Sequence, residues 1–487
     1  MLKIMKRSIV LSSLVVLLAA SLASAQNEVD ALRYSLHESP MTARSFGMGG
    51  AFGAVGADLS SFFSNPAGIG MYKRGGIELS LGLNDNASRS TYMGTPADNS
   101  ATNFTLNNLG LIGSQKTQNK DWRSFNFGVA YSKVNSFYEN ISIHGKANTT
   151  LMYPFSLQAD GILPTEVTSA LPFTSGLAYE TYTINPTDSL GTSYEPANTG
   201  IADQTKNIRR SGSQGETAFG FGANYRDFLY LGMSVNFQSI RFRERSTYSE
   251  NFPSDQFISS FTYDETLYSD GTGVNLKLGA IIRPTKWLRA GVGYHTASRI
   301  ALHETYSAEM SSTQSNGTQW NQMSPSLITE YTIRTPSKLL VNMAFVLGKA
   351  GVVSADYEYV NYKRIRMNGT STNPYNYSAE NDVINAIYRS THKVRAGMEF
   401  RLLKHYYARA GAIYQQNPIQ GNVDALNNPF ITFTGGLGYR SDYFFIDFAL
   451  GYTRSDASYY MYDPGFIDPA TIQTTRVSSL LSVGFRY

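Results

Sequence analysis

Long stretches of this sequence alternate apolar residues with small or polar ones, and this period of two constrains the fold more than any other feature. The clearest example is segment 125–132, which reads Phe-Asn-Phe-Gly-Val-Ala-Tyr-Ser. Successive side chains of a β-strand point to opposite faces, so the pattern predicts strands with one apolar face. The alternation returns at 219–225, 229–237, 274–282 and 288–294. It predicts an all-β chain.

Extending this pattern along the chain predicts about fourteen strands, and single-chain bacterial membrane barrels have an even number. The strands are expected at 76–84, 104–113, 123–136, 216–226, 229–244, 272–283, 287–299, 337–348, 351–366, 392–402, 406–416, 431–440, 443–454 and 476–487. The fold class we predict is therefore a transmembrane antiparallel β-barrel occupying residues 76–487.

The connections between these strands alternate in length. Tight turns are expected at 226–228, 283–286, 348–350, 402–405 and 440–442. Long connections rich in Ser, Thr, Asn, Asp and Tyr are expected at 137–215, 245–271, 300–336, 367–391 and 455–475. Short periplasmic turns and long outer loops are typical of outer-membrane barrels. A soluble sandwich or propeller is the alternative, but such folds rarely keep this strict alternation.

Composition agrees with a barrel in a membrane. The chain has 33 Tyr, 27 Phe and 42 Gly, whereas only 16% of its residues are charged. Aromatic girdles at both membrane interfaces would give this balance. The mean hydropathy of -0.25 does not argue against it, because the interior face of a barrel is polar. The formal net charge of +4 is small for this length and indicates no nucleic-acid partner.

Both ends of the chain carry features of exported proteins. Basic residues precede an apolar run over 9–22, and Ala23-Ser24-Ala25 follows, so we predict a signal peptide over 1–25. A membrane anchor is the alternative, but the run is shorter than the roughly 20 residues that a spanning helix needs. The last strand ends on Tyr487, like the terminal aromatic that the outer-membrane barrel assembly machinery recognises. That machinery, membrane lipid and lipopolysaccharide are the partners we expect in the outer membrane.

Residues 26–75 precede the first strand and do not alternate. They are rich in glycine, for example Phe-Gly-Met-Gly-Gly-Ala-Phe-Gly at 46–53. A phosphate-binding loop is the alternative, but neither Gly-Lys-Ser nor Gly-Lys-Thr is present. Small residues allow backbone to pack closely in a confined space. The segment is therefore predicted to form a hatch, or plug, inside the barrel.

Three groups of residues resemble a known family. The motifs Ala-Arg-Ser-Phe-Gly-Met-Gly-Gly-Ala at 43–51, Ala-Asp at 57–58 and Phe-Phe-Ser-Asn-Pro-Ala-Gly at 62–68 are similar to the N-terminal hatch of the long-chain fatty-acid transporter (FadL-like) family. Weaker matches lie at 279–285, 291–295 and 354–360. The resemblance covers essentially the whole mature chain.

This resemblance implies a fourteen-stranded barrel, closed by its hatch, that carries hydrophobic molecules inward and releases them sideways near a kink in the third strand. Asn65, Pro66 and Ala67 would form the hatch turn, with the asparagine side chain tying it to the wall. An ordinary Asn-Pro turn before the first strand is the alternative. Gly128 and Asn135 are candidates for the kink, although a lone glycine in a strand more often serves packing.

The candidate ligand contacts lie in the same segment. Phe46, Phe52, Phe62 and Phe63 either line the lumen beside an apolar ligand or only seat the plug. Arg44 is a candidate partner for a ligand carboxylate, although the sequence does not locate that contact. The ligand itself stays open: fatty acid, aromatic hydrocarbon, heme and bile-type amphiphiles all suit an apolar pocket.

Catalytic and metal sites find little support. The six histidines are scattered, and His295, His392 and His405 are expected to be structural. The chain has no cysteine, so thiolate metal sites and disulfides are excluded. Asp447 is expected to face the lumen and to pair with an arginine, without a nucleophile motif such as Gly-x-Ser-x-Gly. We therefore expect no enzyme, no metal and no cofactor.

Two functions compete. The first is a monomeric outer-membrane transporter for hydrophobic small molecules such as long-chain fatty acids. The second is a surface-exposed, non-transporting barrel whose long outer loops bind a host or neighbouring-cell component; a general porin is a further alternative. A plugged lumen distinguishes the first from a porin, which must pass water and ions.

Overall fold

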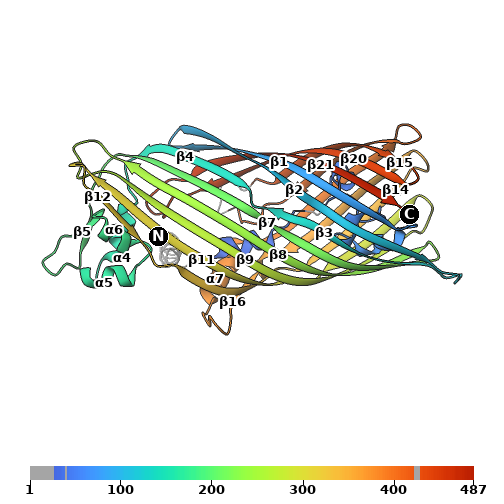
Figure 1. The fold of residues 1–487 in the computed structure, drawn as a ribbon, viewed down its shortest axis with the longest axis horizontal. Coiled ribbons are helices and arrows are strands. Elements are labelled where there is room, and N and C mark those ends of the chain that lie inside the picture. Colours follow the sequence, from blue (N-terminus) through green and yellow to red (C-terminus); the bar gives the residue numbers. More distant parts are fainter. Residues whose placement is uncertain (1–26, 39–40, 422–427) are drawn as a thin grey trace, which may run out of the picture.

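A computed structural model of the chain describes residues 27–38, 41–421 and 428–487. The predicted signal peptide and its cleavage site lie outside these residues. The described strands form one closed antiparallel barrel (Figure 1), and closure is made by pairing of β1 (Gly76–Tyr92) with β21 (Ala470–Arg486). In the part of the chain that the structure describes, no helix is both long enough and apolar enough to cross a membrane.

Fourteen segments make up the barrel wall, as the alternation predicted. After β1 they are β2 (Thr95–Lys116), β3 (Trp122–Ser136), β7 (Ala202–Tyr225), β8 (Leu229–Asn251), β9 (Ile258–Ile282), β10 (Leu288–His295) with its continuation β11 (Arg299–Gln314), β13 (Leu327–Arg334) continued by β14 (Lys338–Val346), β15 (Gly351–Asn361) with β16 (Arg366–Gly369), β17 (Ser390–Arg401), β18 (Tyr406–Gln415), β19 (Phe430–Arg440), β20 (Phe444–Tyr459) and β21.

The remaining elements lie inside the barrel or at its ends. They are the helices α2 (Glu28–Ser35), α3 (Ala43–Gly47), α4 (Met152–Ala159), α5 (Pro164–Ala170), α6 (Ser175–Glu180) and α7 (Ser378–Ile387), the short 3₁₀ helices η2 (Leu59–Phe62), η3 (Pro66–Met71) and η4 (Tyr362–Arg364), and the strands β4 (Glu139–Ala147), β5 (Ile184–Pro186), β6 (Tyr194–Pro196) and β12 (Gln319–Met323).

The outer surface of the wall is apolar around its middle. On β1, the outward residues Ile77, Leu79 and Leu83 are 46%, 40% and 47% exposed, whereas the inward Ser80 is fully buried. Water would penalise so much exposed apolar area, whereas the hydrocarbon of a bilayer solvates it. The fold is that of an outer-membrane barrel, and the end with the long connections is its outer end.

All five tight turns are confirmed. The hairpin between β7 and β8, for example, turns at Arg226 and Asp227, both with φ of 55°. The predicted long loops 245–271 and 300–336 are wrong, because most of their residues belong to β8, β9, β11, β12 and β13. These strands run beyond the membrane, where the outward face meets water and is polar, while the inward face carries buried apolar side chains such as Phe242, Phe261 and Leu302. The apolar outward face from which strands were predicted therefore ends at the edge of the membrane.

The described residues before β1 lie inside the barrel. Their backbone and side chains are hydrogen-bonded to β2, β3, β8, β10, β14, β15, β17, β19 and β21. A segment bonded to strands all round the wall must be enclosed by it. Residues 27–38 and 41–75, which we call the N-terminal segment, therefore occupy the lumen.

Two apolar clusters fill the outer part of the barrel. The outermost is formed by α4 and α6 together with the outer ends of several strands, and Figure 1 shows these helices gathered at one end of the barrel. Below it, Ala31 and Tyr34 of α2 pack with inward side chains of β8, β11 and β13 and with Ile384 of α7. The lumen is thus packed on the outer side as well.

Candidate functional site: the lumen and its N-terminal segment

The Asn65-Pro66-Ala67 turn is fixed to the wall. The Asn65 side chain caps η3 by accepting a hydrogen bond from the Ala67 N–H at 3.2 Å. Its Nδ2 donates to Asn342 Oδ1 at 3.0 Å and to the carbonyl of Val292 at 3.3 Å. Pro66 is the first residue of η3, where its fixed φ suits the helix and its missing N–H costs nothing. The turn therefore caps its own helix and also bonds to two wall strands.

A row of glycines receives this turn. Four glycines lie side by side on four neighbouring strands: Gly222, Gly232, Gly279 and Gly293. A Cβ added at Gly232 would lie 2.0 Å from the carbonyl oxygen of Pro66, and one at Gly279 would lie 2.0 Å from Asn65 Oδ1. The wall must lack side chains here so that the backbone of the segment can touch it.

A second seat lies across the lumen. A Cβ at Gly397 would lie 2.0 Å from the carbonyl oxygen of Met48, and one at Gly411 would lie 2.2 Å from the nitrogen of Gly49. Gly49, whose φ is +62°, donates its N–H to Thr434 Oγ1 at 3.0 Å. The glycine-rich part of the N-terminal segment is thus packed against glycines of the wall.

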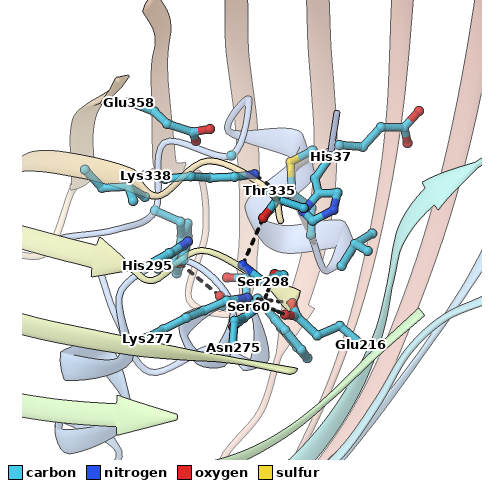
Figure 2. Close-up of a pocket in the computed structure, with 18 of the residues that line it drawn as sticks. His37, Ser60, Glu216, Asn275, Lys277, His295, Ser298, Thr335, Lys338 and Glu358 are labelled. Atoms are coloured by element: carbon cyan, nitrogen blue, oxygen red, sulfur yellow. Dashed lines mark hydrogen bonds and ion pairs between the residues drawn. The ribbon is translucent and has the colours of Figure 1, made fainter. Parts of the chain in front are cut away.

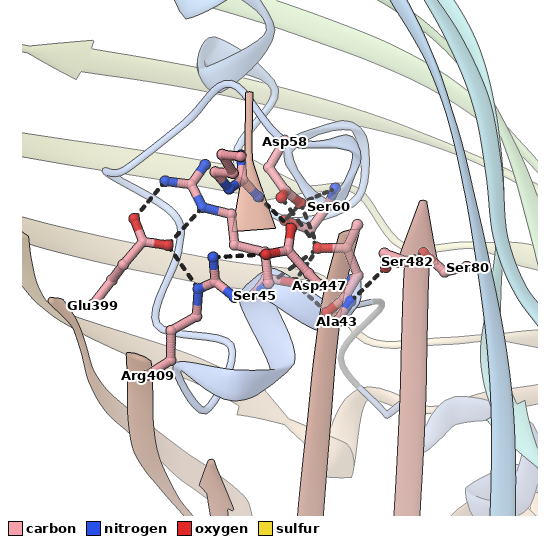
Figure 3. A network of polar contacts seen from close by, with 12 residues as sticks. Ala43, Ser45, Asp58, Ser60, Ser80, Glu399, Arg409, Asp447 and Ser482 are labelled. Atoms are coloured by element: carbon pink, nitrogen blue, oxygen red, sulfur yellow. Dashed lines mark hydrogen bonds and ion pairs between the residues drawn. The ribbon is translucent and has the colours of Figure 1, made fainter. Parts of the chain in front are cut away.

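A buried ion network ties the segment down (Figure 3). Arg44 donates twice to the Glu399 carboxylate, at 2.9 and 2.7 Å. Glu399 also accepts from Arg409 at 2.7 Å, and Arg409 pairs with Asp447 at 2.8 Å. The expected pairing of Asp447 with an inward arginine is confirmed. Removing one member of such a network costs several kcal/mol, because a buried charge loses its partner.

This network bears on Arg44 as a candidate ligand contact. Its guanidinium is engaged by Glu399 and lies against the Phe52 ring, 4.9 Å from the ring centre. Arg44 also lines a cavity of about 710 Å³ among the short turns, at the end opposite the long loops. Arg44 therefore links the N-terminal segment to the wall through its ion pair with Glu399, on the periplasmic side.

The four phenylalanines of the segment divide into two groups. Phe52 and Phe63 line a central chamber, and Phe46 lines a neighbouring cavity. Phe62 is fully buried and packs against the wall, where Gly128 leaves room for its ring. The sequence left open whether these rings line the lumen beside a ligand or only seat the plug; three of them lie at cavities and Phe62 is seated on the wall, while contact with a ligand stays a prediction.

Gly128 is not the point at which the third strand breaks. It pairs with Ile112 on one side and Gly220 on the other, within uninterrupted ladders. A Cβ at this position would meet the Leu111 carbonyl at 2.3 Å and the Phe62 ring at 3.0 Å, so the glycine serves packing. The β3–β7 ladder shifts register at two places, between Trp122 and Ser124 at the start of β3, and between Lys133 and the other candidate, Asn135, shortly before β3 ends.

The wall opens beyond that shift. β2 pairs with β3 only from Lys116↔Ser124 to Asn108↔Ser132. Within the described chain, residues 95–107 of β2 pair with no strand on that side, because β4 pairs with β7 alone. Phe104 and Leu106, 69% and 41% exposed, belong to the apolar outer surface. The gap therefore begins within the apolar band of the wall.

β4 stays in the sheet through its pairing with β7, but it makes no backbone ladder with the β1–β2 hairpin, behind which it lies. Inward hydroxyls of β1 hold it there: Ser88 donates to the carbonyl of Asn140 at 2.6 Å, and Ser90 donates to that of Ser142 at 2.5 Å. Lys133 Nζ reaches across to Thr105 Oγ1 at 2.9 Å. Side chains thus replace the missing backbone ladder.

The central chamber holds several charges (Figure 2). Lys277 pairs with Glu216 at 2.5 Å, and Arg395 pairs with Glu358 at 2.5 Å. Lys338 differs, because no described carboxylate lies within 4.0 Å of its ammonium group. It is the one lysine at the chamber without such a partner among the residues that the structure describes.

Lys338 instead approaches His37, whose Nδ1 lies 3.4 Å from its Nζ. Burial, together with the neighbouring ammonium groups of Lys338 and Lys277, holds the pKa of His37 well below its usual range. The imidazole is therefore neutral, and its Nδ1 can accept a hydrogen bond from Lys338. His37 therefore supplies no counter-charge to Lys338, and the nearest carboxylates act on it only from beyond ion-pair distance.

The chamber encloses only about 50 Å³, and the neighbouring cavity lined by Phe46 about 240 Å³. Both include His37, Glu38 and Met41 in their walls, so the N-terminal segment separates them. Ligand pockets usually measure about 300–1,000 Å³. A long-chain molecule would therefore need this part of the segment to move.

The expected structural histidines sit in three settings. His295 lies at the chamber, 2.6 Å from the Ser64 carbonyl, whereas His392 is on the outer surface beside Tyr357. His405 lines the large cavity among the short turns. Within residues 27–38, 41–421 and 428–487, no three His, Asp or Glu side chains are placed to hold a metal ion.

Comparison with known proteins adds the following. By sequence, the chain matches no family model and no curated protein. By structure, it is similar to the toluene transporter TodX of Pseudomonas putida, with 14% identity, a TM-score of 0.54, and cover of 92% of this chain and 99% of that one. It is also similar to a Pseudomonas aeruginosa FadL homologue, with 14% identity, a TM-score of 0.52, and cover of 93% and 98%. The predicted fold is thereby confirmed.

Proposed function

We propose that this barrel takes up hydrophobic small molecules across the outer membrane as a monomer, with residues 26–75 acting as the hatch. One observation carries the proposal: the lumen is filled by a segment packed on side-chain-free wall, while the wall itself is open beside β2. A porin needs the opposite arrangement, an open lumen in a closed wall. The solved structures that share the fold are named as a toluene transporter and a FadL homologue, which supports an apolar cargo.

We propose further that the cargo is an amphiphile with an anionic head, such as a long-chain fatty acid. Lys338 supports this, because no carboxylate of the described residues lies within 4.0 Å of its ammonium group at the chamber. Phe52 and Phe63 at the same chamber offer apolar surface for the adjoining part of the chain. The tail would leave sideways through the gap beside β2, where the apolar band continues into lipid. Outer-membrane lipid and the barrel assembly machinery remain predicted partners.

The uptake proposal is tested with labelled oleate and labelled toluene, in cells that make this barrel as their only route for such solutes. We expect uptake of at least one of them to fall about tenfold when the protein is deleted. Equal uptake with and without the barrel would refute the proposal and favour a non-transporting surface barrel.

The hatch is tested by Gly232→Ala with Gly435→Ala as its matched control. A Cβ at Gly232 would lie 2.0 Å from the carbonyl of Pro66, whereas at Gly435 the nearest atom is 3.8 Å away. Overpacking of this kind costs about 1–3 kcal/mol. We expect the first variant, and not the second, to show raised conductance in planar bilayers. Large steady conductance of the unchanged protein would contradict the hatch.

The anionic head group is tested by Lys338→Gln. We expect the affinity for oleate to fall about tenfold, as for loss of one charge-assisted hydrogen bond, and the affinity for the uncharged oleyl alcohol to stay the same. An equal loss for both ligands would assign Lys338 a structural role instead.

A further inference from the structure

Arginines gather on the outer surface of β7 and β8, just beyond the apolar band. On β8, Phe237 is the last large apolar outward residue and is 51% exposed. Three exposed arginines follow on the same face, at positions 241, 243 and 245, while Phe242 between them is buried. Arg209 on β7 is exposed as well. In Figure 1, β7 and β8 run side by side along the barrel.

Two of these arginines oppose each other directly. Arg209 pairs with Arg245 in the β7–β8 ladder, and both side chains point outward. Directly opposite residues have Cβ atoms about 4.5–5.5 Å apart, and like charges there are destabilising. Arg243 lies one step along the same face, opposite Ser211. These three residues, Arg209, Arg243 and Arg245, form what we call the arginine patch.

Tyr268 on β9 holds two members of the patch in place. The Arg243 guanidinium carbon lies 5.6 Å from the centre of the Tyr268 ring, and Arg245 Nη2 donates to the Tyr268 hydroxyl at 3.2 Å. Their charges stay uncompensated by this contact, because the phenol is neutral. The patch is therefore an ordered set of cations on an exposed surface.

Nearby carboxylates do not neutralise the patch. Asp270 pairs with Arg241, at 3.2 Å, and the Asp264 carboxylate accepts the Thr247 hydroxyl. None of the three patch arginines has a described carboxylate within 4.0 Å. The adjoining strands repeat the pattern, since Arg299 on β11 directly opposes Arg334 on β13, again on the outward face.

Other outward arginines have a carboxylate neighbour. Arg89 on β1 directly faces Asp98 on β2, 3.4 Å away, and Arg454 on β20 has Asp456 at 3.8 Å. Both arginines are well exposed, at 62% and 58%. Arg89 and Arg454 thus each have an acidic neighbour, whereas the arginine patch has none among the described residues. An anion from outside the chain could neutralise the patch.

We propose that the arginine patch binds the phosphate groups of a phosphorylated glycolipid of the outer leaflet, of the lipopolysaccharide type. Guanidinium groups bind phosphate bidentately and strongly. The position selects a lipid source, because acyl chains lying on Phe237 and Val274 would bring head-group phosphates toward Arg243, the patch member on β8 nearest the apolar band. This inference concerns the outer surface and does not depend on the proposed uptake.

The test compares the triple variant Arg209→Gln/Arg243→Gln/Arg245→Gln with the control Arg89→Gln/Arg454→Gln. Each barrel is purified in detergent, checked for folding by its heat-dependent shift in gel mobility, and titrated in native mass spectrometry. The three probes are bisphosphorylated lipid A, the same lipid after removal of its phosphates, and inorganic phosphate. We expect the unchanged protein and the control to bind bisphosphorylated lipid A, and the triple variant to bind it at least about tenfold more weakly.

Three results would overturn the proposal. The first is that the triple variant binds lipid A as tightly as the control does. The second is that the unchanged protein binds dephosphorylated lipid A as tightly as bisphosphorylated lipid A. The third is that it binds inorganic phosphate as tightly as lipid A, which would remove the lipid as the source. If the triple variant fails to fold, the single variant Arg243→Gln replaces it. Raising the salt concentration must then weaken lipid A binding less for this variant than for the unchanged protein.

Discussion

The two flanks of the β1–β2 hairpin are built in opposite ways. On one flank, β1 is paired with β21 without interruption from Gly76↔Arg486 to Thr91↔Thr471. On the other flank, β2 is paired with β3 only up to Asn108↔Ser132. The barrel wall is therefore closed where its first strand, β1, meets its last strand, β21. It is open on the other side of the β1–β2 hairpin, between β2 and β3.

The unpaired edge of β2 carries an energetic cost that the paired edge of β1 does not. An unpaired backbone group in the hydrocarbon of a bilayer costs several kcal/mol, so sheet edges are normally closed. Here side-chain hydrogen bonds replace part of the missing backbone ladder. They come from Ser88 and Ser90 of β1 and from Lys133 to Thr105. An opening maintained at such cost is expected to have a use, and the following experiments compare the two flanks.

The largest effect is expected from bridging the gap. Thr105→Cys with Lys133→Cys places two thiols across it, in a chain that otherwise has no cysteine. Joining them with a short, cleavable bis-thiol reagent should lower solute uptake at least about tenfold, and cleavage should restore it. The control is Leu83→Cys with Ser479→Cys, which are directly opposite in the closed seam. Undiminished uptake with the gap bridged would exclude it as the exit.

A smaller effect is expected from releasing β4. Ser88→Ala with Ser90→Ala removes two hydroxyls that bond to β4 carbonyls, each contributing about 1 kcal/mol. Amide hydrogens of β4 should then exchange about tenfold faster, while those of β21 keep their protection. Mass spectrometry of deuterated peptides measures both, with Ser100→Ala on exposed β2 surface as the control. Unchanged β4 exchange would mean that pairing with β7 alone holds this strand.

The smallest effect is expected from Lys133→Met, which removes one hydrogen bond across the gap and keeps the length of the side chain. One such bond contributes about 1 kcal/mol, and the seam is untouched. We expect uptake to change less than about threefold and the melting temperature by a few degrees at most, as measured by labelled-solute transport and by heat-dependent gel mobility. A loss as large as that from the bridged gap would show that Lys133 itself contacts the solute.

Much of the wall could be predicted from alternation, because lipid on one side and lumen on the other impose a period of two. The N-terminal segment could be singled out because it lacks that period. The row of wall glycines that receives the Asn-Pro-Ala turn was harder to predict. Gly232 and Gly279 sit at inward positions of predicted strands, so their face could be inferred, but their alignment depends on a register that no single strand encodes. The seat became visible only with the strands in place.

Two residues of the site show the same limit. Lys338 lies at the start of a predicted strand, and alternation with Leu340 and Asn342 places it inward. What sets it apart is that no described carboxylate lies within 4.0 Å of its ammonium group, and this depends on how the neighbouring strands are placed. Gly128 and Asn135 were the two candidates for a kink, and the register shift lies beside the second, between Lys133 and Asn135, whereas Gly128 stays in regular pairing.

The enclosed N-terminal segment has a consequence for assembly. Asn65 bonds to β10 and β14, Arg44 to β17, and Ala43 to β21, so these contacts cannot exist before the last strands are made. The segment precedes every wall strand in the chain but is the last to reach its final contacts. Its phenylalanines therefore lack their wall contacts until the wall strands are in place. The segment precedes the wall in the chain but depends on the finished wall for its own structure.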